Sequence, residues 1–168
     1  AELAPLEKDY ELTSWNGKFF DDAVSVVNEA FTESADALFD PRFKTVEGTE
    51  DIITKIVKDL YAEFLPEATT VLLYKGKPVG FCFMNLTGGQ IANIPIMALK
   101  KEHQGKGLSK HMLKKSVDKL IEMAESGRRP ITEVNTTTET NNFQALKLYR
   151  HIGFKEDYNY PQAYLPIS

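Results

Sequence analysis

The stretch Gln104-Gly105-Lys106-Gly107-Leu108-Ser109 lies between an apolar run and a segment with helical periodicity. The residues before it, Ile91 to Leu99, are mostly apolar and predict a strand that Pro95 interrupts. After it, apolar residues recur at helical spacing. A turn between a strand and a helix directs backbone N–H groups and the positive end of the helix dipole at one point, where a phosphate is stabilised. The two glycines suit this geometry because they lack a Cβ and accept positive φ angles.

The local charge agrees with a phosphate site. Residues 100–129 contain nine Lys or Arg against four Asp or Glu, whereas residues 1–99 contain eight against sixteen. The basic excess is therefore confined to the segment that has the phosphate-binding pattern. The lysines expected near the first turns of its helix are Lys101, Lys106, Lys110 and Lys114.

Spacing excludes two familiar phosphate loops. A nucleotide P-loop has four residues between its first glycine and a Gly-Lys-Ser/Thr sequence, and residues 105–109 do not provide this order. A dinucleotide-binding fingerprint needs a third glycine at position 110, where the chain has Lys110.

Length and composition indicate one domain that spans residues 1–168. The single cysteine, Cys82, lies in an apolar run, so we expect a buried thiol, no disulfide and no metal cluster. No apolar segment approaches the ~20 residues of a membrane span and the first residues lack a signal-peptide pattern, so we expect a cytoplasmic protein without membrane contact. The net charge of −4 argues against nucleic-acid binding, which needs a broad basic face.

The predicted elements alternate between strands and helices. A strand at Lys8–Leu12 precedes a helix at Phe20–Phe31 and a second helix that runs from Thr49 towards Pro66, with Leu60 and Phe64 on its inner face. The later elements are a hairpin of Thr70–Tyr74 and Pro78–Leu86, the strand and long helix of the glycine-rich stretch up to Gly127, a strand at Ile131–Thr138, a short helix after Asn141 or Asn142, and a last hairpin near Pro161.

Two motifs resemble those of one family. Gln104 and Gly107 fit motif A of the GNAT superfamily of N-acetyltransferases, in which Gln or Arg is followed after two residues by Gly, one residue, and Gly or Ala; Ser109 departs from the usual last residue. Further along, residues 142–154 resemble motif B of the same superfamily through Asn142, Ala145, Tyr149, Gly153 and Phe154. The two motifs occur in the expected order. The resemblance covers nearly the whole chain and implies an α+β fold with a mixed, centrally parallel/antiparallel sheet of about six to seven strands flanked by about four helices.

The resemblance also implies a site for acetyl-coenzyme A as co-substrate. Its diphosphate would bind the N–H groups of the six residues Gln104, Gly105, Lys106, Gly107, Leu108 and Ser109, and its pantetheine arm would pair with the strand that ends at Ala98 and Leu99. Main-chain N–H groups near Ala98 or Leu99 would stabilise the oxyanion that forms when an amine attacks the thioester. Asn142 would contact the cofactor.

Acid and base catalysis would complete the reaction. By resemblance, Tyr149 would protonate the departing thiolate, a transfer that a phenol of ordinary pKa ~10 can make. Glu133 is a candidate general base and Glu139 another, since the family does not place the base at one position. His103, beside the turn, is expected to be exposed and is given no role.

We therefore expect an acetyl-coenzyme A-dependent N-acetyltransferase, acting on a primary amine of a small molecule or of a protein or peptide. The alternative is a coenzyme A-binding regulatory or interaction module of the same fold that has lost catalysis; an unrelated phosphate-binding domain is disfavoured by motif B. The amine acceptor is not fixed by the sequence, and a homodimer is left open.

Overall fold

The computed structural model describes residues 3–32, 41–137, 155–157 and 162–166. The strands in this part of the chain are β1 Tyr10–Ser14, β2 Glu63–Phe64, β3 Thr70–Tyr74, β4 Lys77–Cys82, β5 Asn85–Thr87, β6 Ile91–Ile94, β7 Met97–Leu99, β8 Glu133–Thr137, β9 Lys155–Asp157 and β10 Gln162–Pro166. The α-helices are α1 Phe20–Phe31, α3 Val46–Val57 and α4 Leu108–Glu125, and short 3₁₀ turns include η2 Pro41–Lys44, η3 Pro66–Ala68 and η4 Lys101–His103.

The strands form two sheets. The four-stranded sheet has the order β1-β3-β4-β7, and the six-stranded sheet has the order β2-β5-β6-β8-β10-β9. Neighbouring strands are antiparallel except β6 and β8, which run parallel from Ile91↔Glu133 to Ile94↔Thr136. The predicted α+β fold with a mixed sheet is confirmed, with a parallel pair inside the six-stranded sheet.

Two predicted strands each cross from one sheet to the other, which is why the structure has more and shorter strands than the expected six to seven. The run Pro78–Leu86 divides into β4 and β5, and the run Ile91–Leu99 divides at Pro95 into β6 and β7. Proline has no N–H to give to a ladder, so the break at this position follows from the sequence. A backbone hydrogen bond of 2.9 Å from Phe83 N to Ile96 O holds the two crossing segments together.

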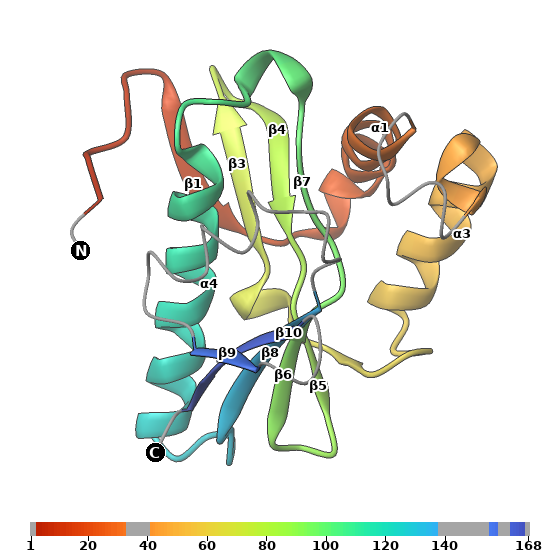
Figure 1. Cartoon of the computed structure of the whole chain (residues 1–168). Coiled ribbons are helices and arrows are strands. Elements are labelled where there is room, and N and C mark those ends of the chain that lie inside the picture. The colour runs from red at the N-terminus through yellow and green to blue at the C-terminus, as the bar shows by residue number, and fades with distance from the viewer. Residues whose placement is uncertain (1–2, 33–40, 138–154, 158–161, 167–168) are drawn as a thin grey trace.

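Helices cover the two faces of this framework, with α4 on one side and α1 and α3 on the other (Figure 1). The core beneath α4 is built from strand residues such as Leu72, Met84 and Ile94 against Met112 and Leu120 of the helix. The opposite core joins α1 and α3 to Val71, Phe81 and Phe83, among others. Alternate residues of one strand face alternate sides, so each crossing strand contributes to both cores.

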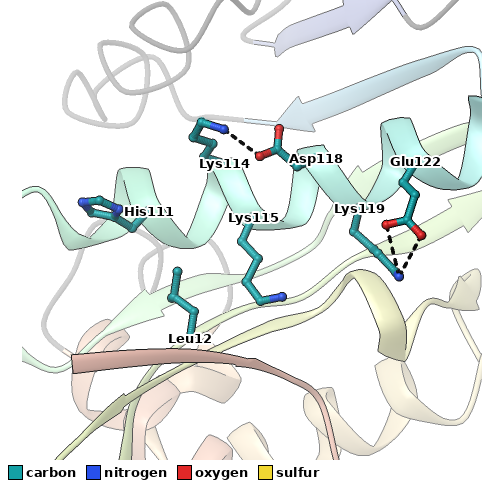
Figure 2. Close-up of a pocket in the computed structure, with 7 residues that line it drawn as sticks. All are labelled: Leu12, His111, Lys114, Lys115, Asp118, Lys119 and Glu122. Atoms are coloured by element: carbon teal, nitrogen blue, oxygen red, sulfur yellow. Dashed lines mark hydrogen bonds and ion pairs between the residues drawn. The ribbon is translucent and has the colours of Figure 1, made fainter. Parts of the chain in front are cut away.

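Ion pairs run along the outer side of α4 (Figure 2). Lys114 Nζ lies 2.6 Å from Asp118 Oδ2, and Lys119 Nζ lies 3.3 Å from Glu122 Oε1. These pairs line a surface pocket of about 390 Å³ that also includes Leu12, His111 and Lys115. Exposed pairs of this spacing contribute about 0.3–0.5 kcal/mol each, so they support the helix only weakly.

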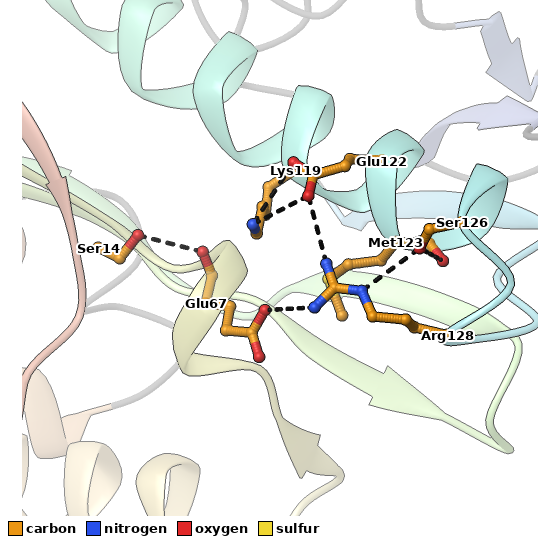
Figure 3. Close-up of polar contacts among 7 residues, drawn as sticks. All are labelled: Ser14, Glu67, Lys119, Glu122, Met123, Ser126 and Arg128. Atoms are coloured by element: carbon orange, nitrogen blue, oxygen red, sulfur yellow. Dashed lines mark hydrogen bonds and ion pairs between the residues drawn. The ribbon is translucent and has the colours of Figure 1, made fainter.

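The end of α4 is fixed by Gly127 and Arg128. Gly127 has a φ of +76°, which confirms it as the residue that stops the helix. The Arg128 guanidinium lies 3.2 Å from Glu67 Oε2 and 3.4 Å from Glu122 Oε1, so it joins the helix to η3 (Figure 3). Arg129 pairs with Glu63 of β2.

The second helix differs from its prediction at both ends. It begins earlier because the Thr45 hydroxyl accepts a hydrogen bond of 2.9 Å from Gly48 N, an N-cap that the sequence analysis missed. It ends at Val57, since the chain turns at Asp59 with a φ of +62°. Leu60 is consequently 65% exposed rather than on an inner helix face, and Phe64 lies in β2.

Within the part of the chain that the structure describes, no helix is both long and apolar enough to cross a membrane.

Candidate functional site

The glycine-rich turn leads into α4 with its backbone accessible. Gly105 has a φ of +84° and Gly107, the N-cap of α4, has a φ of +76°. Among the described residues no side chain caps the helix at Gly107, and the first turn of α4 holds no acidic residue. A Cβ built on either glycine would meet no atom within 4 Å. There is therefore open space beside both glycines at the N-terminus of a long helix, a place where an anion is stabilised.

One side chain ties this turn to the strand before it. Gln104 Nε2 donates a hydrogen bond of 2.9 Å to the carbonyl oxygen of Leu99, the last residue of β7. Lys106 is exposed in the turn and Lys110 is half-buried in the first turn of α4. Lys114, also expected near the phosphate, is engaged by Asp118. We call residues 104–107 the glycine loop.

The outer edge of β7 carries main-chain groups that face away from β4. Backbone bonds from Lys100 N to Val79 O and from Phe83 N to Ile96 O, both 2.9 Å, fix the hydrogen-bond phase of the β4–β7 pair. In an antiparallel ladder these bonds alternate, so Ala98 bonds to Phe81, its register partner. The N–H and C=O groups of Met97 and Leu99 point the other way. Among the described strands, none pairs with this edge.

The edge of β7 lies beyond the last residues of β6 that pair with β8. β8 accompanies β6 only as far as Ile94↔Thr136 and does not continue beside β7. The outward main-chain groups of β7 are followed in the chain by the glycine loop. Of the two strand residues named by the sequence, Leu99 has its N–H directed outward, whereas the main-chain groups of Ala98 are directed to β4.

His103 is buried, so the expectation of an exposed side chain is wrong. It is only 7% exposed, and a hydrogen bond of 2.6 Å joins its Nδ1 to the hydroxyl of Tyr10 in β1. Its ring also packs on Tyr74, with ring centroids 4.9 Å apart. Tyr10 and His103 are 93 residues apart in the chain, which is why the sequence pattern did not reveal the contact.

A pocket of about 410 Å³ lies on the α1 side of the glycine loop. Three lysines, Lys77, Lys100 and Lys106, line it together with Asp22 and Glu102. Because both cationic and anionic side chains line it, the pocket has no single charge preference.

Two asparagines face each other across β5 and β6 of the six-stranded sheet. Asn85 is 4% exposed, and within the described residues its buried Oδ1 has no hydrogen-bond partner. Its register partner in β6 is Asn93, whose Nδ2 donates a hydrogen bond of 2.8 Å to Thr87 Oγ1. A buried acceptor without a donor costs about 1–3 kcal/mol, and the sequence analysis did not identify this position.

The structure does not bring Glu133 close to the glycine loop. Glu133 begins β8 and is the register partner of Ile91, the first residue of β6. Seven residues separate Ile91 from Ala98, which is roughly 20 Å of extended chain at ~3.3 Å per residue. Asn142, Tyr149 and the second base candidate, Glu139, lie outside the described residues.

The buried cysteine agrees with its prediction. Cys82 is fully buried, and burial raises the pKa of its thiol to about 12, with the hydrogen bond to Ser116 acting in the opposite direction. Among the described residues, no group of three or more His, Cys, Asp or Glu side chains could hold a metal ion.

A family model for the acetyltransferase (GNAT) domain matches residues 66–156, more than half of the 168 residues. The chain belongs to the GNAT family. The match includes β7, the glycine loop and α4, so the motif A resemblance is confirmed at the level of the family. No curated protein sequence matches this GNAT chain at a significant level.

Solved structures show the same fold. The ribosomal-protein-S18-alanine N-acetyltransferase from Escherichia coli matches with a TM-score of 0.68 and 16% identity, over 95% of this chain and 94% of that protein. An Escherichia coli GNAT family N-acetyltransferase solved in complex with CoA matches with a TM-score of 0.67 and 13% identity, over 99% of this chain and 86% of that protein. A Pyrococcus horikoshii protein matches with a TM-score of 0.66 and 16% identity over 94% of this chain, which spans about half (47%) of that protein. At these identities the likeness establishes the GNAT fold.

Proposed function

We propose that this GNAT domain transfers the acetyl group of acetyl-coenzyme A to a primary amine of a small molecule or a protein. The observation that supports it best is the continuity of two features: the outward main-chain groups of β7 and the uncapped N-terminus of α4 behind Gly105 and Gly107. Acetyl-coenzyme A carries its thioester on a long pantetheine arm that is joined to a diphosphate. Its binding needs a site for the diphosphate and a strand edge along which the arm can extend. A GNAT neighbour with bound CoA supports the same ligand.

In the proposed complex, the diphosphate binds the N–H groups between Gln104 and Ser109, with Lys106 beside it. The amide groups of the pantetheine arm pair with Met97 and Leu99 as an added strand. Since Leu99 O already accepts a hydrogen bond from Gln104, the groups left for the arm and for the thioester oxygen are the Leu99 N–H and both groups of Met97.

The reaction then requires stabilisation of the negative charge on oxygen, a proton donor for the thiolate, and an acceptor for the proton that the attacking amine loses. The amine nitrogen attacks the thioester carbon, the carbonyl oxygen becomes negative, and the C–S bond breaks to release a thiolate. An outward N–H of β7 stabilises the oxyanion. Tyr149, from the motif B resemblance, gives its proton to the thiolate, and the proton that the amine nitrogen loses passes to water. Glu133 receives no role as a base, because its place at the start of β8 separates it from β7.

The acceptor would approach on the side of the six-stranded sheet opposite α4, where the half-buried Asn93 lies. The S18-alanine N-acetyltransferase among the structural neighbours acts on a protein amine, so both peptides and small amines belong in the test.

Binding is tested first. Acetyl-coenzyme A is expected to raise the melting temperature of the protein, whereas adenosine phosphates without the pantetheine arm have little effect, because they cannot pair with β7. Equal shifts from both ligands would indicate a general phosphate site instead.

Turnover is tested by thiol release with a panel of alkyl amines, diamines and peptides with free N-termini. Tyr149→Phe is expected to lower kcat by about 10²-fold or more, the usual effect of losing a general acid. Tyr61→Phe is the matched control, since Tyr61 is 51% exposed and its hydroxyl contacts only Arg42 among the contacts found in the described residues. Cofactor binding without turnover for any amine would favour the inactive coenzyme A-binding module.

A further inference from the structure

The glycine loop has few anchors of its own. Gly105 and Gly107 have no side chain, and the exposed side chain of Lys106 makes no hydrogen bond within the described residues. The side chain of Gln104 donates its hydrogen bond to Leu99 O of the preceding strand. Each flexible residue that must be fixed on binding costs conformational entropy. A loop that holds a diphosphate tightly therefore needs further support before the ligand arrives.

The residue directly before the loop provides such support. His103 ends η4, and its backbone N–H donates to Lys100 O at 3.0 Å. The buried imidazole is fixed on one side by the 2.6 Å hydrogen bond to the Tyr10 hydroxyl. Tyr74 packs on both rings, with centroids 4.8 Å from Tyr10 and 4.9 Å from His103.

Tyr10 belongs to a rigid element. It is the first residue of β1 and the register partner of Tyr74 in β3, so it is held by the four-stranded sheet. The backbone bond from Lys75 N to Asp9 O, 2.8 Å long, closes the same end of the pair. The Tyr10 hydroxyl, which is hydrogen-bonded to His103, therefore belongs to the edge strand of the sheet.

Tyr10 also contacts the loop beyond His103. The Lys106 ammonium lies 5.8 Å from the centroid of the Tyr10 ring, within the range of a cation–π interaction. One tyrosine therefore contacts the residue before the glycine loop and the lysine inside it. Fixing both leaves the intervening Gly105 little freedom to reorient.

We propose that Tyr10 and His103 are positioning residues that hold the glycine loop in its diphosphate-binding conformation. The proposal rests on the proposed function, because it concerns the affinity of the same site for coenzyme A. Neither side chain touches the reacting atoms, so their effect is on cofactor binding and not on the chemical step.

The main test is the dissociation constant of coenzyme A, measured by calorimetry for the wild type and Tyr10→Phe. The variant keeps the ring and loses only the hydroxyl, so it is expected to fold. Loss of one hydrogen bond predicts about a fivefold rise in Kd. Tyr74→Phe is the matched control, because the Tyr74 hydroxyl makes no hydrogen bond within the described residues, and its Kd is expected to stay within about twofold of the wild type. An unchanged Kd for Tyr10→Phe overturns the inference.

A second variant tests whether the two residues act through one contact. His103→Leu is expected to weaken coenzyme A binding at least as much as Tyr10→Phe, and the double variant no more than His103→Leu alone. Fully additive effects would mean that the hydrogen bond is not the link, and would overturn the proposal.

A kinetic measurement separates positioning from general damage. With an amine that the panel identifies, Tyr10→Phe is expected to raise KM for acetyl-coenzyme A about fivefold and leave kcat unchanged. S-acetylpantetheine, which lacks the diphosphate, is expected to react equally well with both proteins. An equal loss with both donors overturns the positioning role.

If the wild type itself binds no coenzyme A, the proposed function fails. This outcome differs from one in which the wild type binds coenzyme A and the variant binds it equally well, which overturns only the positioning role.

Discussion

Gly107 combines a φ of +76° with open space on the side where a Cβ would stand. An alanine there would be strained by about 1 kcal/mol and would place a methyl group in the open space beside the turn, where the diphosphate is proposed to bind. We expect Gly107→Ala to lower the unfolding free energy by about 1 kcal/mol and to raise the Kd for coenzyme A at least tenfold.

Gly89 supplies the matched control for this prediction. It has the same φ of +76° and equally open surroundings, but it lies in the turn between β5 and β6. Gly89→Ala is expected to cost similar stability and to leave coenzyme A binding unchanged. Equal losses of affinity in both variants would show that strain alone, and not the place of Gly107, weakens binding.

Cys82 makes stability depend on pH in the alkaline range. Burial raises the pKa of its thiol from 9.0 to about 12. Below pH 9 the thiol is protonated in both states; above pH 9 the unfolded chain loses the proton first, so the folded state loses stability as pH rises towards 12. We expect the advantage of the wild type over Cys82→Ala, measured by urea denaturation, to shrink by about 1.4 kcal/mol per unit above pH 9. Parallel pH curves for the two proteins would contradict this.

At the scale of the element, Gly48 lets α3 pack closely against η2. A Cβ at this position would lie 2.2 Å from the carbonyl oxygen of Arg42, which is backbone and cannot turn aside. Gly48→Ala gains about 1 kcal/mol in helix propensity but meets an overpacking cost of about 1–3 kcal/mol or more. We therefore expect a net loss of unfolding free energy of at least about 1 kcal/mol in chemical denaturation. Glu50→Ala, at an exposed position of the same helix, is the control and is expected to change stability by less than about 0.5 kcal/mol. A stabilised Gly48→Ala protein would mean that α3 is free to move away from η2.

At the scale of the whole molecule, the parallel pairing of β6 and β8 decides which carboxylates can act. The register places Glu133 beside Ile91, at the end of the six-stranded sheet that is remote from the glycine loop. We expect Glu133→Gln to retain kcat within about twofold in the thiol-release assay, with Tyr149→Phe measured alongside. A tenfold or greater loss in Glu133→Gln would restore Glu133 as the candidate base.

The sequence was sufficient for features that depend on neighbours in the chain. The helix Phe20–Phe31, the hairpin at Lys75 and Gly76, the glycine loop and the stop at Gly127 all follow from local periodicity and from the φ angles that glycine accepts. The same local patterns led to the GNAT resemblance that the family model bears out. Tyr149 and Asn142 lie outside the described residues, so their roles stay predictions.

Features that join distant segments were decided only by the tertiary structure. The start of β8 carries Glu133 away from the loop, the crossing of two strands between sheets turns Met97 and Leu99 outward, and a contact across 93 residues buries His103 against Tyr10. Periodicity reports which face of an element is apolar, but it holds no information on which strand lies beside which, or in what register. Long-range packing makes that choice, since it is the burial of the two cores together that selects one arrangement of the strands.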